Sequence, residues 1–142
     1  MAFTGNYTCN SFKQQLFEGD FDFSATTTQT FKIALYTNDA TLDQTTTTYT
    51  TTGEVVATGY TAGGELITPS LAIDSSTGIT YVDFSNASWS GAITARGALI
   101  YRVTTGNPAI CVLDFGSDKT STTTFQVEFP PNTSTTSLIR LS

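Results

Sequence analysis

The sequence predicts an all-β fold, a single-domain antiparallel β-sandwich or barrel with one short N-terminal helix. About seven or eight runs rich in β-branched and aromatic residues recur along the chain, separated by turn segments of Gly, Pro, Ser, Thr and Asn. Only one stretch has the spacing of a helix. With 142 residues the chain can bury a core of its own, so we expect residues 1–142 to form one domain.

The strongest strand signal lies between residues 98 and 116. Residues 98–103 and 109–116 are apolar at nearly every position, and the segment between them contains Thr, Gly, Asn and Pro, as hairpin turns do. A continuous apolar run indicates a strand covered on both faces, because a strand with one wet face alternates apolar with polar residues. We therefore expect this hairpin at the centre of the sheet.

The N-terminal part predicts an arm followed by the helix. Residues 1–9 mix apolar and small polar side chains and predict an extended arm. In residues 10–18, Phe12 and Leu16 are four positions apart, with polar residues on the other side. Asn10 or Ser11 can cap the start of this helix and Gly19 can cap its end.

The remaining strands follow from alternation and from turn residues. Residues 29–37 alternate cleanly, with Phe31, Ile33 and Leu35 on one face. Residues 54–60 predict a short strand or a turn, and Pro69 makes residues 66–73 an edge strand or a bulge. Further strands are expected at residues 79–84, 89–94, 123–129 and 138–141.

Residues 38–52 form a long polar segment dominated by threonine, which we call the Thr-rich loop. Leu42 and Tyr49 are its only large apolar residues. A connection of this length in a small domain usually has a function. We expect either a surface loop that binds a partner or an arm that a neighbouring molecule orders, and in the free protomer we expect it to be mobile.

Charge and composition exclude several classes of function. The net charge of −6 and the six scattered basic residues argue against nucleic acid as a partner. No apolar run long enough for a membrane helix and no signal-peptide pattern occur, which predicts synthesis in the cytoplasm. Histidine is absent, so neither a His-based hydrolase nor a common zinc site is expected. We therefore predict a protein that is not an enzyme and has no cofactor.

Two sets of residues are candidates for binding. Glu18, Asp20 and Asp22 alternate along the chain and could present oxygens to calcium, although a solvated acidic turn explains them more simply. Tyr49, Tyr60 and Trp89 are the interface or ligand candidates, and Trp89 with Tyr60 could form a platform for stacking sugars. A lone Trp in a β domain is more often part of the core.

The two cysteines, Cys9 and Cys111, are too few for a disulfide scaffold. Cys111 lies in an apolar strand, where a thiol behaves as a small hydrophobic group. We expect both to be structural, and a disulfide between them is not expected in a protein made in the cytoplasm.

Four stretches together resemble a family of small structural proteins of tailed bacteriophages: residues 7–13 (YTCNSFK), 59–64 (GYTAGG), 95–101 (ARGALIY) and 111–119 (CVLDFGSDK). The resemblance spans most of the chain. It implies a non-enzymatic virion component present in many copies, and it implies no catalytic residue. We expect a homo-oligomeric capsid decoration (cement) protein whose partners are the major capsid protein or other virion proteins.

Two other roles in the particle stay open from sequence. One is a tail-associated or fibre domain that binds carbohydrate of the host surface through Trp89 and nearby aromatic residues. The other is a component of the tail tube or connector. The number of copies in the particle distinguishes these roles, because shell symmetry demands many more copies of a cement protein than of a fibre.

Overall fold

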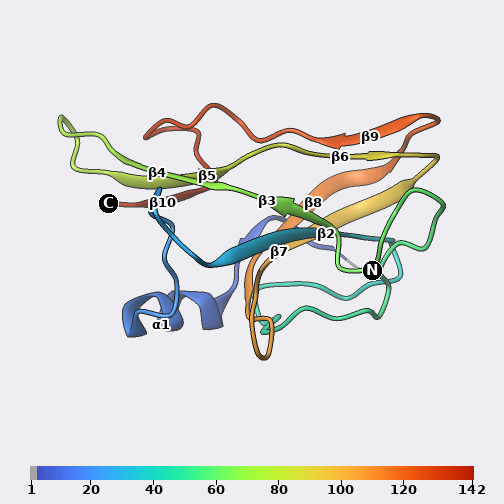
Figure 1. Cartoon of the computed structure of the whole chain (residues 1–142), viewed down its shortest axis with the longest axis horizontal. Coiled ribbons are helices and arrows are strands. Elements are labelled where there is room, and N and C mark those ends of the chain that lie inside the picture. The colour runs from blue at the N-terminus through green and yellow to red at the C-terminus, as the bar shows by residue number, and fades with distance from the viewer. Residues whose placement is uncertain (1–2) are drawn as a thin grey trace.

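The longest strands of the chain, β7 (Thr94–Val103) and β8 (Ala109–Thr120), form an antiparallel hairpin at the centre of the fold. The structure is a computed structural model that describes residues 3–142. Its largest sheet has the strand order β1-β8-β7-β2-β3, and two smaller sheets have the orders β10-β5-β4 and β6-β9. The smaller sheets lie above the large one (Figure 1), so the fold is an all-β, sandwich-like domain, as predicted.

The other elements are short, and most lie where the sequence places them. They are β1 (Tyr7–Thr8), α1 (Asn10–Glu18), β2 (Thr30–Tyr36), β3 (Glu65–Ile67), β4 (Pro69–Ile73), β5 (Thr80–Phe84), β6 (Ala87–Ser90), β9 (Thr124–Val127) and β10 (Ile139–Leu141).

The central sheet is buried on both faces over residues 98–101 and 109–112, which confirms the interpretation of the continuous apolar runs for these residues; the ends of both runs, 102–103 and 113–116, are half-buried or exposed. Leu99 and Ile100 point to opposite faces of β7, and both are fully buried. On the face of Ile100, the rings of Phe23, Phe31 and Phe84 pack between the two layers at centroid distances of 5.2 to 6.0 Å. On the face of Leu99 the cover consists of loops, described below.

Helix α1 has the predicted bounds, but its N-cap residue differs from the prediction. Cys9, in an extended conformation, is its N-cap, and its side chain makes no capping hydrogen bond, so neither Asn10 nor Ser11 fills this role. At the other end Gly19 has a φ of 86°, a left-handed conformation that glycine adopts without strain. The amide of Gly19 donates to the carbonyl of Leu16, which ends the helix as predicted.

Two strand predictions need correction, and a third is decided between its alternatives. The run 66–73 is two edge strands, because β3 ends at Ile67 and β4 begins at Pro69, each at the edge of a different sheet. Residues 54–60 contain the predicted turn and no strand, and they contribute one β-bridge, from Glu54 to Tyr36. The run 89–94 is interrupted, since β6 ends at Ser90 and β7 begins at Thr94.

Residues 3–9 are part of the domain and do not extend from it as an arm; residues 1–2 lie outside the described part of the chain. Strand β1 pairs with β8, and the Phe3 side chain is only 1% exposed. A Cβ atom on Gly97 would come within 2.4 Å of the Phe3 ring, so the glycine makes room for the aromatic side chain. Burial of Phe3 explains why this segment stays on the sheet.

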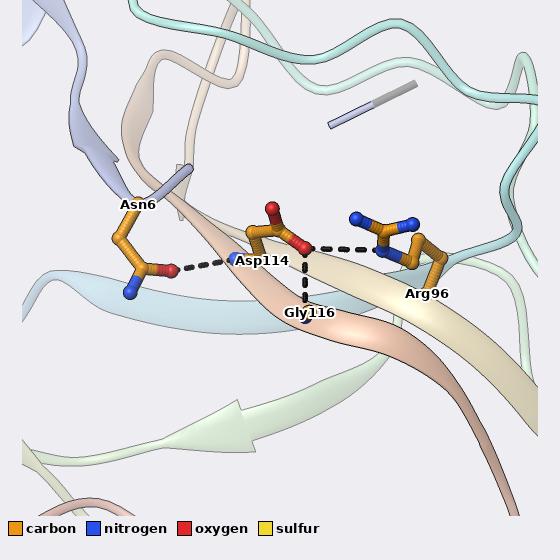
Figure 2. A network of polar contacts seen from close by, with 4 residues as sticks. All are labelled: Asn6, Arg96, Asp114 and Gly116. Carbon is orange, nitrogen blue, oxygen red and sulfur yellow. Dashed lines mark hydrogen bonds and ion pairs between the residues drawn. The ribbon is translucent and has the colours of Figure 1, made fainter. Parts of the chain in front are cut away.

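A polar network around Asp114 fastens the same segment (Figure 2). The Asn6 side-chain oxygen accepts a hydrogen bond from the Asp114 amide at 2.6 Å, and the Asp114 carboxylate accepts from Arg96 Nε and from the Gly116 amide. A register shift between Ala95 and Gly97 places Arg96 beside Asp114. Burial alone would raise the pKa of Asp114, but the hydrogen bonds and the guanidinium outweigh it and lower this pKa.

Both cysteines are buried free thiols. Cys9 is the N-cap of α1, and Cys111 lies in β8 opposite Thr8, the residue before Cys9. Burial raises the pKa of Cys9 to about 11, and it raises the pKa of Cys111 further. The thiols therefore act as packing groups.

The packing of Phe3 predicts the effect of a truncation. Phe3→Ala should lower the free energy of unfolding by about 3–5 kcal/mol, since it removes a buried aromatic ring and leaves a cavity above Gly97. Urea unfolding followed by fluorescence measures this. The matched control is Phe17→Ala, because Phe17 is 85% exposed and its loss should change stability by less than about 0.5 kcal/mol. Equal stability of the two variants would contradict the packing of residues 3–9.

Candidate functional site

Two of the three aromatic candidates, Tyr49 and Tyr60, converge on one buried carboxylate, that of Glu54. The Tyr49 hydroxyl donates to Glu54 Oε2 at 2.6 Å, and the Tyr60 hydroxyl donates to Glu54 Oε1 at 2.6 Å. The Gly63 amide donates to Oε1 at 2.7 Å. A buried carboxylate needs such donors, because an unpaired charge away from water is costly. We call these residues the Glu54 cluster.

A further tyrosine, Tyr101, and a second hydrogen bond of Tyr60 tie the Glu54 cluster to the central sheet. The Tyr101 hydroxyl donates to the Gly63 carbonyl at 2.7 Å, and the Tyr101 ring stacks on Tyr49 with centroids 4.7 Å apart. The Tyr60 oxygen accepts from the Leu35 amide of β2 at 2.9 Å. Strands β2 and β7 are thereby joined to residues 49–63 through side chains as well as through backbone.

The tyrosines of the cluster stay protonated at any physiological pH. Burial raises the pKa of Tyr60, and its hydrogen bond to Glu54 raises it further. The same two causes, in the same order, raise the pKa of Tyr49. Burial, followed by the charge of Glu54, raises the pKa of Tyr101 to about 12. These phenols are therefore permanent donors, and the arrangement is suited to holding loops in place.

The Thr-rich loop lies against the lower face of the central sheet (Figure 1). Its Leu42 side chain is buried, and the Tyr36 hydroxyl of β2 donates to the Thr50 carbonyl at 2.6 Å. Backbone hydrogen bonds run from the Asn10 amide to the Gln44 carbonyl and from the Ala109 amide to the Thr47 carbonyl. The loop is thus the cover of this face of the sheet within the single chain, and the expectation of a mobile arm that a neighbouring molecule orders is wrong.

Trp89, the third aromatic candidate, belongs to the core. Its side chain is 2% exposed, and its ring lies 6.2 Å from Phe125 and 6.0 Å from Tyr60, centroid to centroid. A ring that is buried to this extent has no accessible face on which a sugar could stack. Trp89 is therefore not available as the sugar-binding residue of the fibre hypothesis, although it lies next to Tyr60 as that hypothesis required.

The acidic candidates Glu18, Asp20 and Asp22 do not converge on a common point. Glu18 accepts a hydrogen bond from the Gln14 side chain, and Asp22 accepts one from the Ser24 amide. The Ser24 side chain, followed by this amide, lowers the pKa of Asp22. The Asp20 carbonyl accepts from Arg102 and from Gln29. Within residues 3–142 no three acidic, Cys or His side chains come together as a metal site would need.

Exposed apolar side chains gather at one end of the small sheet β10-β5-β4. Cross-strand pairing places Leu71, Val82 and Ile139 side by side, followed outward by Ile73, Thr80 and Leu141. Val82 is buried, but Ile73 is 64% exposed and Leu141 is 55% exposed. The apolar face of this sheet therefore continues beyond the core. The sequence carries no separate signal for this surface, because these residues alternate as those of any half-buried strand do.

Asp83 in β5 is a buried carboxylate with incomplete hydrogen bonding. It is 3% exposed; Oδ1 accepts from the Phe84 amide at 3.0 Å, and Oδ2 has no hydrogen-bond partner among the described residues. Burial raises the pKa of Asp83, while the backbone amides of Phe84 and Leu138 act in the opposite direction.

No protein-family model matches the chain, and neither the curated proteins nor the solved structures contain a match to it. In the part of the chain that the structure describes, no helix has the length and apolar character that crossing a membrane requires.

The Glu54 cluster predicts strong coupling between its members. Glu54→Gln should lower the free energy of unfolding by about 1.5–3 kcal/mol, because an amide cannot accept both phenolic hydrogen bonds. Tyr49→Phe should also destabilise, and the double variant should lose less than the sum of the two changes. Chemical denaturation measures all three, with Tyr7→Phe as the control for an exposed phenol. Additive losses would show that Tyr49 and Glu54 do not act together.

The buried Asp83 predicts a distinct pH dependence. A carboxyl group whose pKa is higher in the folded than in the unfolded state destabilises the fold at neutral pH, and this penalty disappears as the pH falls through the folded pKa. The stability of Asp83→Asn relative to the unaltered protein should therefore be greatest near pH 7 and should decrease on acidification. Thermal unfolding across this pH range measures it, and a difference that is independent of pH would contradict the raised pKa.

Proposed function

We propose that this chain is a capsid decoration (cement) protein of a tailed bacteriophage. In this role it is a virion component without enzymatic activity that binds across neighbouring subunits of the shell as a homo-oligomer. The proposal begins from the resemblance of residues 7–13, 59–64, 95–101 and 111–119 to phage structural proteins.

The observation that carries the proposal is the apolar sheet end formed by Leu71, Ile73 and Leu141. These side chains share one face and remain in contact with water in the single chain. A contiguous exposed apolar surface favours association with another protein, because association removes it from water. A cement protein has this requirement, since it stabilises the shell by adding contacts between subunits.

The stiffness of the domain supports the same role. The Glu54 cluster and the buried Leu42 hold the Thr-rich loop on the sheet before any partner binds. A surface that is ordered in advance loses little conformational freedom on binding, so more of the contact energy remains as affinity. The net charge of −6 keeps unassembled copies apart in solution.

The proposal predicts a high copy number and a stabilising effect. Quantitative mass spectrometry of purified particles should find the chain in amounts comparable to the major capsid protein, on the order of hundreds of copies, as shell symmetry requires. Particles assembled without the chain should release their DNA at a lower temperature, and adding the purified protein should restore the higher temperature. Tens of copies or fewer, with unchanged heat stability, would place the chain in the tail and overturn the proposal.

A further inference from the structure

A groove of about 640 Å³ separates helix α1 from the overhanging end of the sheet β10-β5-β4. Leu16 and Phe17 line it from the helix, and Ile79, Ile139 and Leu141 line it from the sheet. Figure 1 shows the β4–β5 hairpin and the C-terminal strand on one side and α1 on the other. Both walls are therefore apolar and come from different parts of the chain.

Phe17 makes this groove unusual for a free surface. Its ring is 85% exposed, whereas Phe12, five residues earlier on the same helix, is fully buried. The helix therefore directs one aromatic ring into the core and a second one to the side of the groove. An exposed aromatic ring beside an exposed apolar sheet face is the composition of an interface centre, where aromatic anchors contribute most of the binding energy.

The charges of the groove differ in sign from those of the whole protein. Lys13 is the charged side chain on the helix wall of the groove, in a chain with 12 acidic and 6 basic residues. Arg140 also belongs to the lining, but its side chain alternates with Ile139 and Leu141 along β10, and its guanidinium donates to the Thr135 carbonyl at 2.6 Å. The only ion pair within residues 3–142 joins Arg96 to Asp114, so Lys13 has no carboxylate partner there. The groove is thus complementary to a segment that carries acidic groups.

We infer that this groove is the docking site for a segment of the shell protein that presents a large apolar side chain next to a carboxylate. The inference rests on the proposed function for the identity of the partner. A two-fold contact between copies of this chain fits poorly, because an isologous interface would bring the Lys13 side chains of the two copies together without a carboxylate between them.

The first test compares two exposed apolar positions. Phe17→Ser should weaken binding of the purified protein to undecorated shells by about tenfold or more, as the loss of an aromatic anchor does. Val56→Ser is the matched control, because Val56 is 97% exposed and lies outside the groove, and it should bind as the unaltered protein does. Both variants should keep their melting temperature, since neither side chain is buried.

The charge test uses the same binding measurement. Lys13→Glu should weaken binding to the shells and reverse its salt dependence, whereas Lys119→Glu, at the far end of β8 and outside the groove, should leave both unchanged. Shells that bind Phe17→Ser and Lys13→Glu as tightly as the unaltered protein would overturn the docking site while leaving the cement role intact.

A cross-linking experiment in whole particles separates failure of the groove from failure of the proposed function. With p-benzoylphenylalanine at position 17, irradiation should link the chain to the major capsid protein. A link to a second copy of the chain, to a tail protein, or to no protein at all would overturn the inference. The copy number is measured on the same particles, so a low count identifies failure of the cement role independently of the cross-link.

Discussion

Burial of the central strands on both faces is the constraint on which the rest of this structure depends. Leu99 and Ile100 are adjacent in β7, point in opposite directions and are both inaccessible to water. A sandwich of two sheets covers only the face of Ile100. The opposite face needs a second cover, and the Thr-rich loop provides it (Figure 1). The domain therefore has three layers, and the lowest one, the Thr-rich loop, contains no regular sheet.

This arrangement explains why a polar, irregular segment contains buried acidic and aromatic groups. Loops that cover apolar strands must satisfy their own polar groups away from water. The tyrosines achieve this because each has a large apolar ring and one hydroxyl, so the ring packs on the sheet while the hydroxyl reaches Glu54 or a carbonyl. Glu54 gathers two such hydroxyls and the Gly63 amide at one place, which fixes the path of the loop.

The sequence was informative where local pattern determines structure and uninformative where distant residues meet. The central hairpin, the helix ending at Gly19 and the alternating strand β2 follow from periodicity and capping, and all three are present. The convergence of Tyr49 and Tyr60 on Glu54 has no local signal, since a single Glu beside Val55 resembles any surface acid. Trp89 was ambiguous for the same reason, because composition cannot tell a buried ring from an exposed one. Nothing local indicates that Phe3 is buried, because the glycine that accommodates it, Gly97, is far away in the chain.

The two buried thiols make the fold indifferent to the redox state of its surroundings. Only a thiolate attacks a disulfide or reacts readily with an oxidant, and burial keeps Cys9 and Cys111 in the unreactive thiol form. Neither residue is cross-linked, so a reductant has nothing to cleave. The thiols therefore contribute to stability as packed side chains, and the fold depends on no covalent cross-link.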